Sequence, residues 1–339
     1  MRAPPNASAR DSLRKLREIL RLDEDEENIK IAEGESNGAI TGDGTTTLNT
    51  KTERIGRTAS VNILAWRLAM NDLTKRMGEL RDNAGATGLW VRADAGRMKY
   101  TGEKNDFTQF QFGADRQIDA LGGARLGAAF TCTDSDLDHA DGGGDNKIYG
   151  LALYGTWLGE GGSFLDVIAK AARLETDSTV SQTHSDFSTS AWSFSAEVGH
   201  RFDFAPAFIE PQLELSYGHV SGKTFDSVNR VTNIASETTV EAVDTLVGRA
   251  GFRAGVASPN RKGGAYLHLS VLHEFDGDGV VRRGDGVYTE DMGDTWGEYG
   301  LGAHYNFTPN VQVHADVERT SGALLSVPWR VNVGARWSF

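Results

Sequence analysis

The chain has 339 residues, of which 39% are hydrophobic, and it contains no apolar run long enough to cross a membrane as a helix. Its 47 acidic against 35 basic residues give a net charge of -12, and this balance argues against nucleic acid as a partner. The 40 glycines against 7 prolines favour many strands joined by turns, while a single cysteine, Cys132, excludes an internal disulfide and a cysteine-based zinc cluster.

Residues 1–57 are expected to form a linker or the frayed end of a preceding domain, partly disordered. A short basic stretch at 10–22 is followed at once by an acidic run at 23–27, and residues 33–53 are small, polar and rich in turn formers. The first 28 residues have neither an apolar core nor a cleavage site, so we expect no signal peptide within this chain.

Residues 58–82 are predicted to form one long helix, because the segment has no proline and a single glycine, Gly78. At 1.5 Å per residue its 25 positions would span roughly 37 Å, which is long enough to cross a bilayer. Charged residues such as Arg67 and Lys75 interrupt the apolar ones too often for a helix that faces lipid. The helix therefore requires a polar conduit around it.

From residue 83 to the C-terminus the hydrophobic period changes from about 3.6 to 2, as expected for strands with one apolar face. In the last segment, for example, Val331 and Val333 alternate with Arg330 and Asn332. Twelve such runs occur, near residues 88–101, 106–119, 122–134, 147–159, 163–176, 188–203, 207–220, 238–256, 264–277, 294–307, 309–320 and 328–339.

The connections between these runs alternate in length, and this alternation decides the architecture. Short links at 120–122, 160–162, 205–206 and 308 take turns with long polar segments at 134–145, 177–186, 221–236 and 277–291. Membrane barrels with short periplasmic turns and long outer loops show this pattern, whereas a soluble β-sandwich has no reason to sort its loops in this way. We therefore predict an all-β fold, a 12-stranded antiparallel transmembrane β-barrel over residues 83–339, with an N-terminal α-helix, residues 58–82, threaded through the lumen.

The predicted barrel constrains individual strands. A slip of the final strand by one residue would place Arg330 and Arg336 in lipid, at about 2–4 kcal/mol each near the midplane, so the register of this strand should be fixed. Pro211 lies inside the seventh run and cannot donate a hydrogen bond, so we expect it near the periplasmic start of its strand or at a bulge.

Several short motifs follow one another in order along residues 60–339. They are Asn71-Asp72-Leu73-Thr74-Lys75-Arg76-Met77-Gly78-Glu79-Leu80-Arg81-Asp82, Gly113-Ala114-Asp115, Phe164-Leu165-Asp166-Val167-Ile168-Ala169-Lys170, Ile209-Glu210-Pro211-Gln212-Leu213-Glu214-Leu215 with Tyr217-Gly218, and Gly248-Arg249. Together with the helix and the twelve runs that end in an aromatic residue, they resemble the translocator (β) domain of autotransporters, the type V secretion system. Within that class the resemblance is strongest to the serine protease autotransporters of enterobacteria.

The resemblance implies a function that follows from topology. The barrel would insert in the bacterial outer membrane, export its own N-terminal passenger to the cell surface and keep the helix in its pore, so that residues 1–57 would be a passenger remnant. The partners implied are outer-membrane lipid and the barrel assembly machinery, with Phe339 as the assembly signal, and a monomer without cofactors is expected. The alternative is a porin or solute channel with no secretion role, which would conduct where a plugged barrel passes little current.

In the enterobacterial group the passenger is released by self-cleavage between two asparagines inside the barrel. The side-chain amide of the first asparagine attacks its own carbonyl to form a succinimide, assisted by lumenal carboxylates. Asn71 matches the first asparagine, whereas the second is Asp72 here, which adds a negative charge beside the site. By resemblance Asp166 is the catalytic acid and Glu197 and Glu214 are neighbouring lumenal acids, and the period of two independently places all three on the polar face.

The chemistry expected is at most one autoproteolytic turnover, and no serine and histidine pair on one lumenal face points to a protease or lipase barrel. The same acids also have a structural interpretation, because lumenal carboxylates would pair with Arg249 and Arg253 of the wall or with Arg67 and Lys75 of the helix. The two interpretations remain open at the level of sequence.

No metal site is expected. The eight histidines form no His-x3-His or HExxH pair. Asp134, Asp136, Asp138 and Asp145 imitate ligand positions of an EF-hand loop, but His139 stands where that loop requires glycine. The segment 134–145 is therefore expected to be an acidic outer loop.

Overall fold

The computed structural model describes residues 38–40, 46–48, 50–70, 87–101, 103–139, 141–260, 262–284, 286–322 and 324–339. Two short strands, β1 (Gly38–Ile40) and β2 (Thr46–Leu48), pair antiparallel, and the helix α3 (Thr50–Met70) follows them. Within the described residues, no helix combines the length and the apolar character that a membrane crossing requires.

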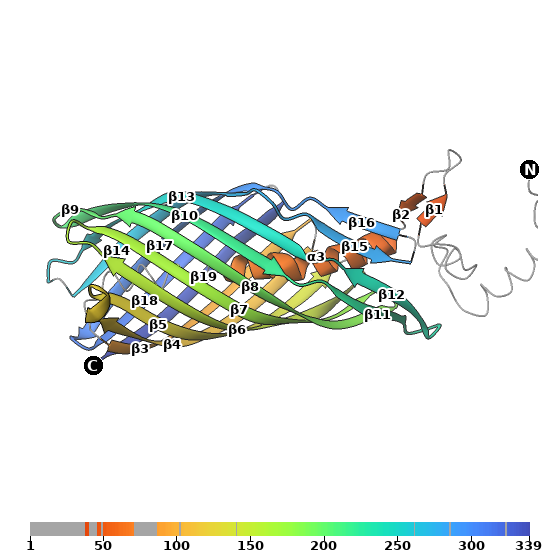
Figure 1. The fold of residues 1–339 in the computed structure, drawn as a ribbon, viewed down its shortest axis with the longest axis horizontal. Coiled ribbons are helices and arrows are strands. Elements are labelled where there is room, and N and C mark those ends of the chain that lie inside the picture. The colour runs from red at the N-terminus through yellow and green to blue at the C-terminus, as the bar shows by residue number, and fades with distance from the viewer. Residues whose placement is uncertain are drawn as a thin grey trace, which may run out of the picture.

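Twelve long antiparallel strands close into a barrel (Figure 1), as predicted. They are β3 (Thr87–Tyr100), β4 (Glu103–Ile118), β5 (Ala124–His139), β6 (Gly142–Leu158), β7 (Ser163–Val180), β8 (Thr183–His200), β10 (Ala207–Val220), β13 (Val243–Ala257), β14 (Gly263–Glu274), β17 (Thr295–Thr308), β18 (Val311–Ser321) and β19 (Leu325–Ser338). The last strand, β19, pairs with the first, β3, and so completes the ring. Closure satisfies the backbone groups of both strands, which lipid could not do.

The strand faces follow the predicted period of two. On β19, Val331, Val333 and Trp337 face outward and are 41 to 54% exposed, whereas Arg330 and Arg336 face the lumen and are buried. This register keeps both arginines out of lipid, which confirms the register prediction. Along this part of β19 the outer face is therefore apolar and the lumen face is polar.

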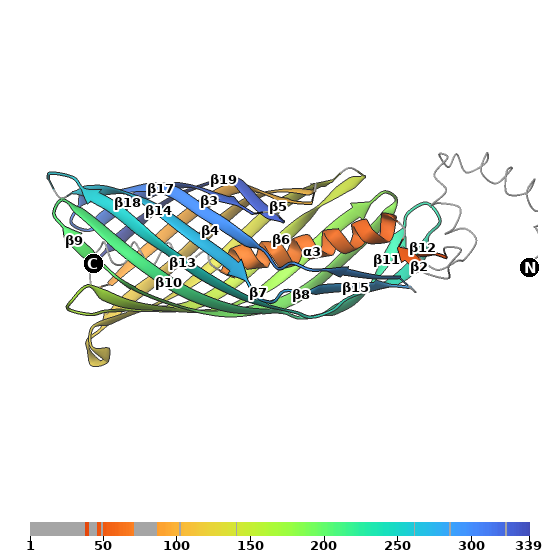
Figure 2. The same cartoon turned by 90° about the horizontal axis from the view of Figure 1, so that it is seen from above.

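The two ends of the barrel differ (Figure 2). At the end that holds the C-terminus the links are short, and η1 (Asp119–Leu121) forms one of them. At the other end two extra hairpins project: β11 (Lys223–Asn229) with β12 (Ile234–Val240), and β15 (Gly279–Arg283) with β16 (Gly286–Glu290). We call these the short-turn end and the projecting end. Because outer-membrane barrels place their short turns in the periplasm, the projecting end is the outer one.

The expectation of long outer connections is confirmed between β10 and β13 and between β14 and β17, which carry the two projecting hairpins, but it is wrong for the segments 134–145 and 177–186. Strands β5 and β6 extend through 134–145, and β7 and β8 extend through 177–186, so both segments are tight hairpins. Their outward residues, such as Asp134, Asp136 and Asp138, are polar and exposed, and apart from Leu137 and Val180 few apolar residues face inward. This composition resembles that of a loop. The EF-hand comparison fails with the loop, since Asp136 lies directly opposite Asp145 on paired strands.

The seventh long strand, β10, changes partner near its start. It pairs with β9 (Phe202–Phe204) up to Ile209 and with β8 from Gln212 onward. Pro211 lies at this change of partner, close to the short-turn end. A residue that has no amide hydrogen is tolerated where the ladder is interrupted, which confirms the expectation for Pro211.

The helix α3 lies inside the barrel and runs from the projecting end toward the middle of the lumen (Figures 1 and 2). It begins at Thr50, earlier than the predicted start at residue 58, and it is described as far as Met70. The predicted helical part at 71–82 lies outside the described residues, so the division of the chain at residues 57 and 82 stays a prediction. The strands that lie alongside α3 include β7, β8, β10, β15 and β16.

Candidate functional site in the plugged lumen

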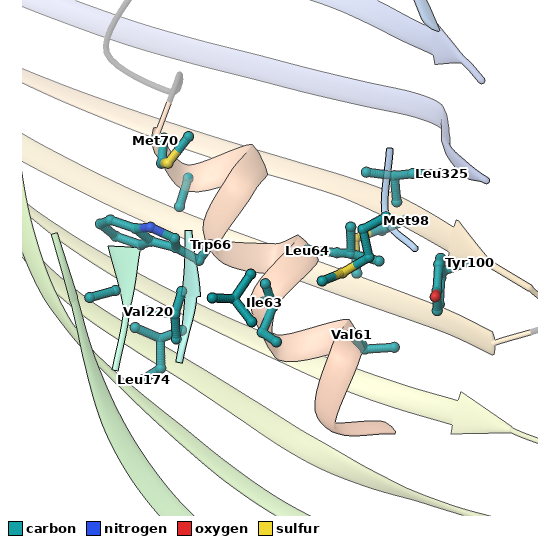
Figure 3. Packing of buried hydrophobic residues seen from close by; sticks show 14 of the residues in the cluster. Val61, Ile63, Leu64, Trp66, Met70, Met98, Tyr100, Leu174, Val220 and Leu325 are labelled. Carbon is teal, nitrogen blue, oxygen red and sulfur yellow. The ribbon is translucent and has the colours of Figure 1, made fainter. Parts of the chain in front are cut away.

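The helix packs on the lumen wall through apolar side chains. Val61, Leu64 and Trp66 are completely buried and Met70 is 2% exposed, and all four belong to one cluster with apolar residues of the wall (Figure 3). The wall contributes Met98, Tyr100, Leu137, Ile148, Leu174, Val220, Leu272, Trp296 and Leu325 among others. At about 1.5–3 kcal/mol for each fully buried side chain, the four helix residues contribute roughly 6–12 kcal/mol. The helix is therefore a tightly packed plug.

Two glycines allow the helix and the wall to approach closely. A Cβ atom on Gly56 of α3 would lie 2.3 Å from Cδ1 of Tyr288 in β16. A Cβ atom on Gly218 of β10 would lie 2.1 Å from Sδ of Met70. A larger residue at Gly56 would displace the Tyr288 ring or the helix, whereas a larger residue at Gly218 would force the flexible Met70 side chain to move.

Arg67, a predicted contact residue of the helix, is neutralised at the wall. Its Nε atom lies 2.9 Å from Oε2 of Glu274, the last residue of β14, and its side chain is 3% exposed. The same guanidinium donates to the carbonyl oxygen of Met292 at 3.0 Å and lies 5.8 Å from the ring centre of Trp296. A buried charge is costly unless it is paired in this way, so the ion pair favours one rotation and depth of α3.

Lys170 of β7 binds the C-terminal end of the described helix. Its Nζ atom donates to the carbonyl oxygen of Ala69 at 2.8 Å and lies 5.9 Å from the ring centre of Trp66. A cation at this position complements the free carbonyl groups of the last helical turn. Neither Lys170 nor Glu274 is predicted as a helix partner from sequence. The period of two does place Lys170 on the lumen face, but it does not report what lies across the lumen.

Three predicted site residues lie side by side on one row of the wall. Asp166 of β7 is opposite Glu197 of β8, Glu197 is opposite Glu214 of β10, and Glu214 is opposite Arg249 of β13. The three acids point inward and are 2 to 6% exposed. We call Asp166, Glu197 and Glu214 the acid row.

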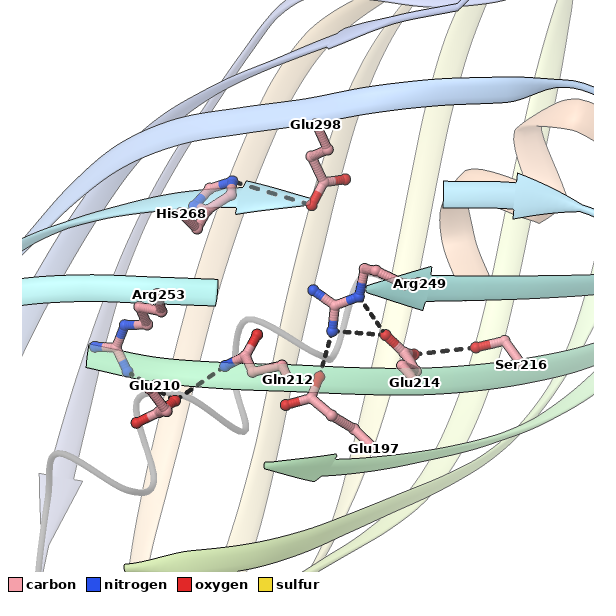
Figure 4. A network of polar contacts seen from close by, with 9 residues as sticks. All are labelled: Glu197, Glu210, Gln212, Glu214, Ser216, Arg249, Arg253, His268 and Glu298. Carbon is pink, nitrogen blue, oxygen red and sulfur yellow. Dashed lines mark hydrogen bonds and ion pairs between the residues drawn. The ribbon is translucent and has the colours of Figure 1, made fainter. Parts of the chain in front are cut away.

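Arg249 binds two members of the acid row (Figure 4). Its Nε atom donates to Oε2 of Glu214 at 2.6 Å, and its terminal nitrogen also bonds to Oε2 of Glu197. Asp166 accepts a hydrogen bond from Oγ1 of Thr156. The pairing with Arg249 is the contact expected under the structural interpretation of these acids. The row nevertheless presents several carboxylate oxygens to the lumen, and a carboxylate oxygen can accept a proton as a general base.

Arg253 pairs with a different acid. Its terminal nitrogen lies 4.0 Å from Oε1 of Glu210 (Figure 4). Arg201 approaches Oε2 of the same residue at 3.8 Å. The guanidinium of Arg253 also lies 4.2 Å from the ring centre of Tyr266. The contact predicted between Arg253 and a lumenal acid is thus made with Glu210, which is not assigned to the site from sequence.

The predicted cleavage residues Asn71 and Asp72, and the predicted helix contact Lys75, lie outside the described residues. The last described helix residue, Met70, packs against Gly218, and Gly218 is about 13 Å along β10 from the row position of Glu214, at 3.3 Å per residue. The acid row therefore lies between the described end of α3 and the short-turn end.

Phe339 lies beside the seam that closes the barrel. Its N–H group donates to the carbonyl oxygen of Thr87 at 2.9 Å, and its ring is 62% exposed beside Trp337. On the inner side Arg336 donates two hydrogen bonds of 2.7 Å to the carboxylate of Asp115, reaching from β19 across β3 to β4. Bidentate pairs of this kind are among the strongest polar contacts, so this pair stabilises the junction of β19 with β3 and β4 at the short-turn end.

The wall also brings together candidate metal ligands that lie far apart in sequence. One ligand atom from each of His268, Glu298 and Glu318 falls within 4.8 Å of the other two. The expectation of no metal site rests on spacing along the chain, and this spacing carries no information on contacts between strands.

The autotransporter beta-domain family matches residues 89–318, which is more than half of the chain. The pertactin autotransporter of Bordetella parapertussis is 32% identical over 292 residues, which cover 81% of this chain and 31% of pertactin. The serine protease EspC of Escherichia coli O127:H6 is 30% identical over 282 residues, which cover 80% of this chain and 21% of EspC. The chain therefore spans about a third or less of the length of these relatives.

Solved structures share the fold. The beta domain of the Bordetella autotransporter Brka aligns with a TM-score of 0.60 and 24% identity, covering 75% of this chain and 100% of that one. The translocator domain of the autotransporter NalP from Neisseria meningitidis aligns with a TM-score of 0.68 and 16% identity, covering 86% of this chain and 100% of that one. With its closed barrel, apolar outer wall and matching family profile, the chain belongs to the autotransporter beta-domain family and is an export barrel of the outer membrane.

Proposed function

We propose that this barrel carries a passenger linked to the N-terminal side of α3 through the outer membrane, and then keeps α3 in the lumen as a plug and anchor. The observation that carries the proposal is the orientation of the buried helix. Its Gly56 packs on Tyr288 at the projecting end, whereas Ala69 binds Lys170 deeper in the lumen. A segment that precedes α3 is therefore delivered to the outer side.

We further propose that the partners are outer-membrane lipid, the barrel assembly machinery and the passenger in cis, and that the barrel is a monomer. Outward side chains such as Leu151 and Leu153, each 67% exposed, support a lipid environment. The exposed ring of Phe339 supports recognition of the last strand during assembly. Pairing of β19 with β3 closes the barrel within one chain, which supports a monomer.

Export is tested with an epitope placed before Thr50, in a chain supplied with an export signal and expressed in a Gram-negative cell. The epitope is expected to bind antibody on intact cells and to be removed by external protease. A folded barrel with the epitope still in the periplasm would refute export. Heat-modifiable mobility on denaturing gels, which reports the folded barrel, serves as the control.

The plug is tested by conductance in planar bilayers. The intact chain is expected to pass little current, and deletion of residues 50–70 is expected to raise it, because the helix fills the lumen. If the intact chain conducts like the deletion, the porin alternative replaces the plug.

Release of the passenger by self-cleavage after Asn71 is a second candidate activity, and the position of the acid row beyond the end of α3 favours it. The side-chain nitrogen of Asn71 would attack the carbonyl carbon of the same residue. The attack forms a succinimide and breaks the bond to Asp72, whose amino group leaves with a proton, while a base accepts the proton of the attacking amide. We assign the base to Asp166, which by resemblance is the catalytic acid and which faces the lumen in the acid row.

The intact mass of the barrel extracted from outer membranes decides between release and anchoring. A species of about 29 kDa that begins at Asp72 would mean release, and an uncleaved chain of 36.7 kDa would refute it without affecting the plug. Asp166→Asn is expected to abolish the shorter species. The matched control is Asp316→Asn, which changes a buried lumenal acid on β18 and should leave cleavage intact.

A further inference from the structure

We propose that the lumen wall beside the plug holds one divalent transition-metal ion of the Zn²⁺ type, with His268, Glu298 and Glu318 as its ligands. The three residues come from three adjacent strands, β14, β17 and β18, and all three side chains face the lumen. One imidazole nitrogen with two carboxylates is a ligand set that suits Zn²⁺ and neighbouring first-row ions.

The distances between the three ligand atoms are close to those of a bound metal site. Nε2 of His268 lies 3.3 Å from Oε2 of Glu318 and 4.0 Å from Oε1 of Glu298 (Figure 4 shows His268 and Glu298). Ligands of a tetrahedral zinc site, at bond lengths of 2.0–2.2 Å, lie about 3.3–3.6 Å apart. Nε2 of His268 is buried, and no hydrogen bond to it is formed by any residue in the described parts of the chain. A rotation of the Glu298 side chain would complete the three-ligand face.

A glycine makes this arrangement possible. Gly300 of β17 lies opposite His268 on one side and opposite Glu318 on the other. A Cβ atom on Gly300 would lie 2.5 Å from Cε1 and 2.9 Å from Nε2 of His268. The imidazole therefore lies across Gly300, in the direction of Glu318, in space that any other residue would occupy. The group is held by backbone register and not by flexible surface side chains.

The two carboxylates border space for a further ligand. Glu298 and Glu318 line a cavity of about 50 Å³ together with Arg67 and Met70 of the plug. A cavity of this size holds a water molecule, which would supply the fourth ligand of an open zinc site.

Two of the arginines that border the same cavity, Arg249 and Arg330, bind acids outside the proposed ligand set. Arg249 binds Glu214, and Nε of Arg330 donates to Oδ1 of Asp94 at 3.1 Å. Arg249 also interacts electrostatically with Glu298, so a bound cation would share this carboxylate with Arg249. The cation would join three strands of the wall directly beside the inner end of α3.

The test is metal binding by the full chain, folded in detergent and purified without a histidine tag. Calorimetric titration with Zn²⁺ is expected to give one ion per barrel, and Co²⁺ is expected to show the strong visible absorption of a four-coordinate site. His268→Gln and Glu318→Gln should each weaken binding at least tenfold. His314→Gln, at a buried lumenal histidine outside the group, should leave it unchanged.

A pair of glycine variants tests the geometry without removing a ligand. Gly300→Ala should weaken Zn²⁺ binding at least tenfold, because the new methyl group would meet both the imidazole of His268 and the carbonyl oxygen of Val317 on β18, the strand that carries Glu318. Gly302→Ala is the matched control on the same strand and face, where the new methyl group would meet Tyr266 instead. Absence of binding by the wild-type barrel at millimolar Zn²⁺, or equal affinity in the His268→Gln and Gly300→Ala variants, would overturn the proposal. Heat-modifiable mobility confirms that each variant is folded.

Discussion

Replacement of Trp66 by alanine tests how the plug is held. Trp66 is completely buried in the cluster between α3 and the wall, and its ring lies 5.9 Å from Nζ of Lys170. Truncation of a tryptophan in a core costs about 3–5 kcal/mol. At 1.4 kcal/mol for each factor of ten, detachment of the helix from the wall becomes about 150 to 4,000 times more favourable. The four buried helix side chains contribute roughly 6–12 kcal/mol, so the plug should still be docked most of the time.

The assay is hydrogen exchange measured by mass spectrometry on the barrel in lipid nanodiscs. Amide hydrogens of α3 that exchange only when the helix detaches should exchange about 150 to 4,000 times faster, because the detached state is more populated by this factor. Exchange in peptides of the barrel wall should change little. Trp192→Ala is the matched control, because Trp192 is 46% exposed on the outer wall and does not touch the plug cluster. An increase below tenfold in α3, with a folded wall, would refute the conclusion that apolar packing holds the plug.

Further predictions concern the polar contacts. Arg67→Met leaves a buried carboxylate without its ion pair at a cost of about 3–5 kcal/mol, so bursts of current should appear in planar bilayers; a trace like that of the wild type would contradict this. Arg336→Met leaves Asp115 buried and charged at a similar cost of about 3–5 kcal/mol. The folded band on denaturing gels should therefore be lost at a lower temperature. An unchanged temperature would refute the conclusion that this pair stabilises the closed barrel. On the β5–β6 hairpin, desolvation and the hydrogen bond with Asp145 raise the pKa of Asp136, so the folded chain gains stability from this proton at low pH and loses it as the pH rises through that pKa. Asp145→Asn should lower the pKa of Asp136 in a carboxyl NMR titration, and an unchanged titration would refute the pairing.

The sequence predicts the barrel well because lipid imposes a strict rule on each strand. Only alternation of apolar and polar side chains satisfies both lipid outside and a polar lumen inside, so the twelve runs, the inward direction of Arg330 and Arg336, and the closed ring could all be inferred. The ends of the strands could not be inferred from the sequence. Beyond the apolar band the outward residues of the segments 134–145 and 177–186 are exposed and polar, and most of the inward residues are polar too. These segments therefore have loop-like composition although they are paired.

The direction of the acid-row side chains could be predicted from the sequence, but their contacts could not. The period of two determined that Asp166, Glu197 and Glu214 face the lumen, because a side chain can only point to one face or the other. Their alignment with Arg249 depends on the stagger between neighbouring strands, and the sequence pattern does not specify that stagger.

By itself, then, the sequence determined the class of fold, the face on which each strand residue lies and the presence of a helix that needs a polar conduit. Only the tertiary structure decided which residues meet across strands and across the lumen. Lys170 and Glu274 hold the helix, and His268 lies over Gly300 beside Glu318, because chain closure brings distant strands into register. The period of two along one strand tells which face of the barrel a side chain points to. Which residues that side chain contacts depends on the positions of the other strands.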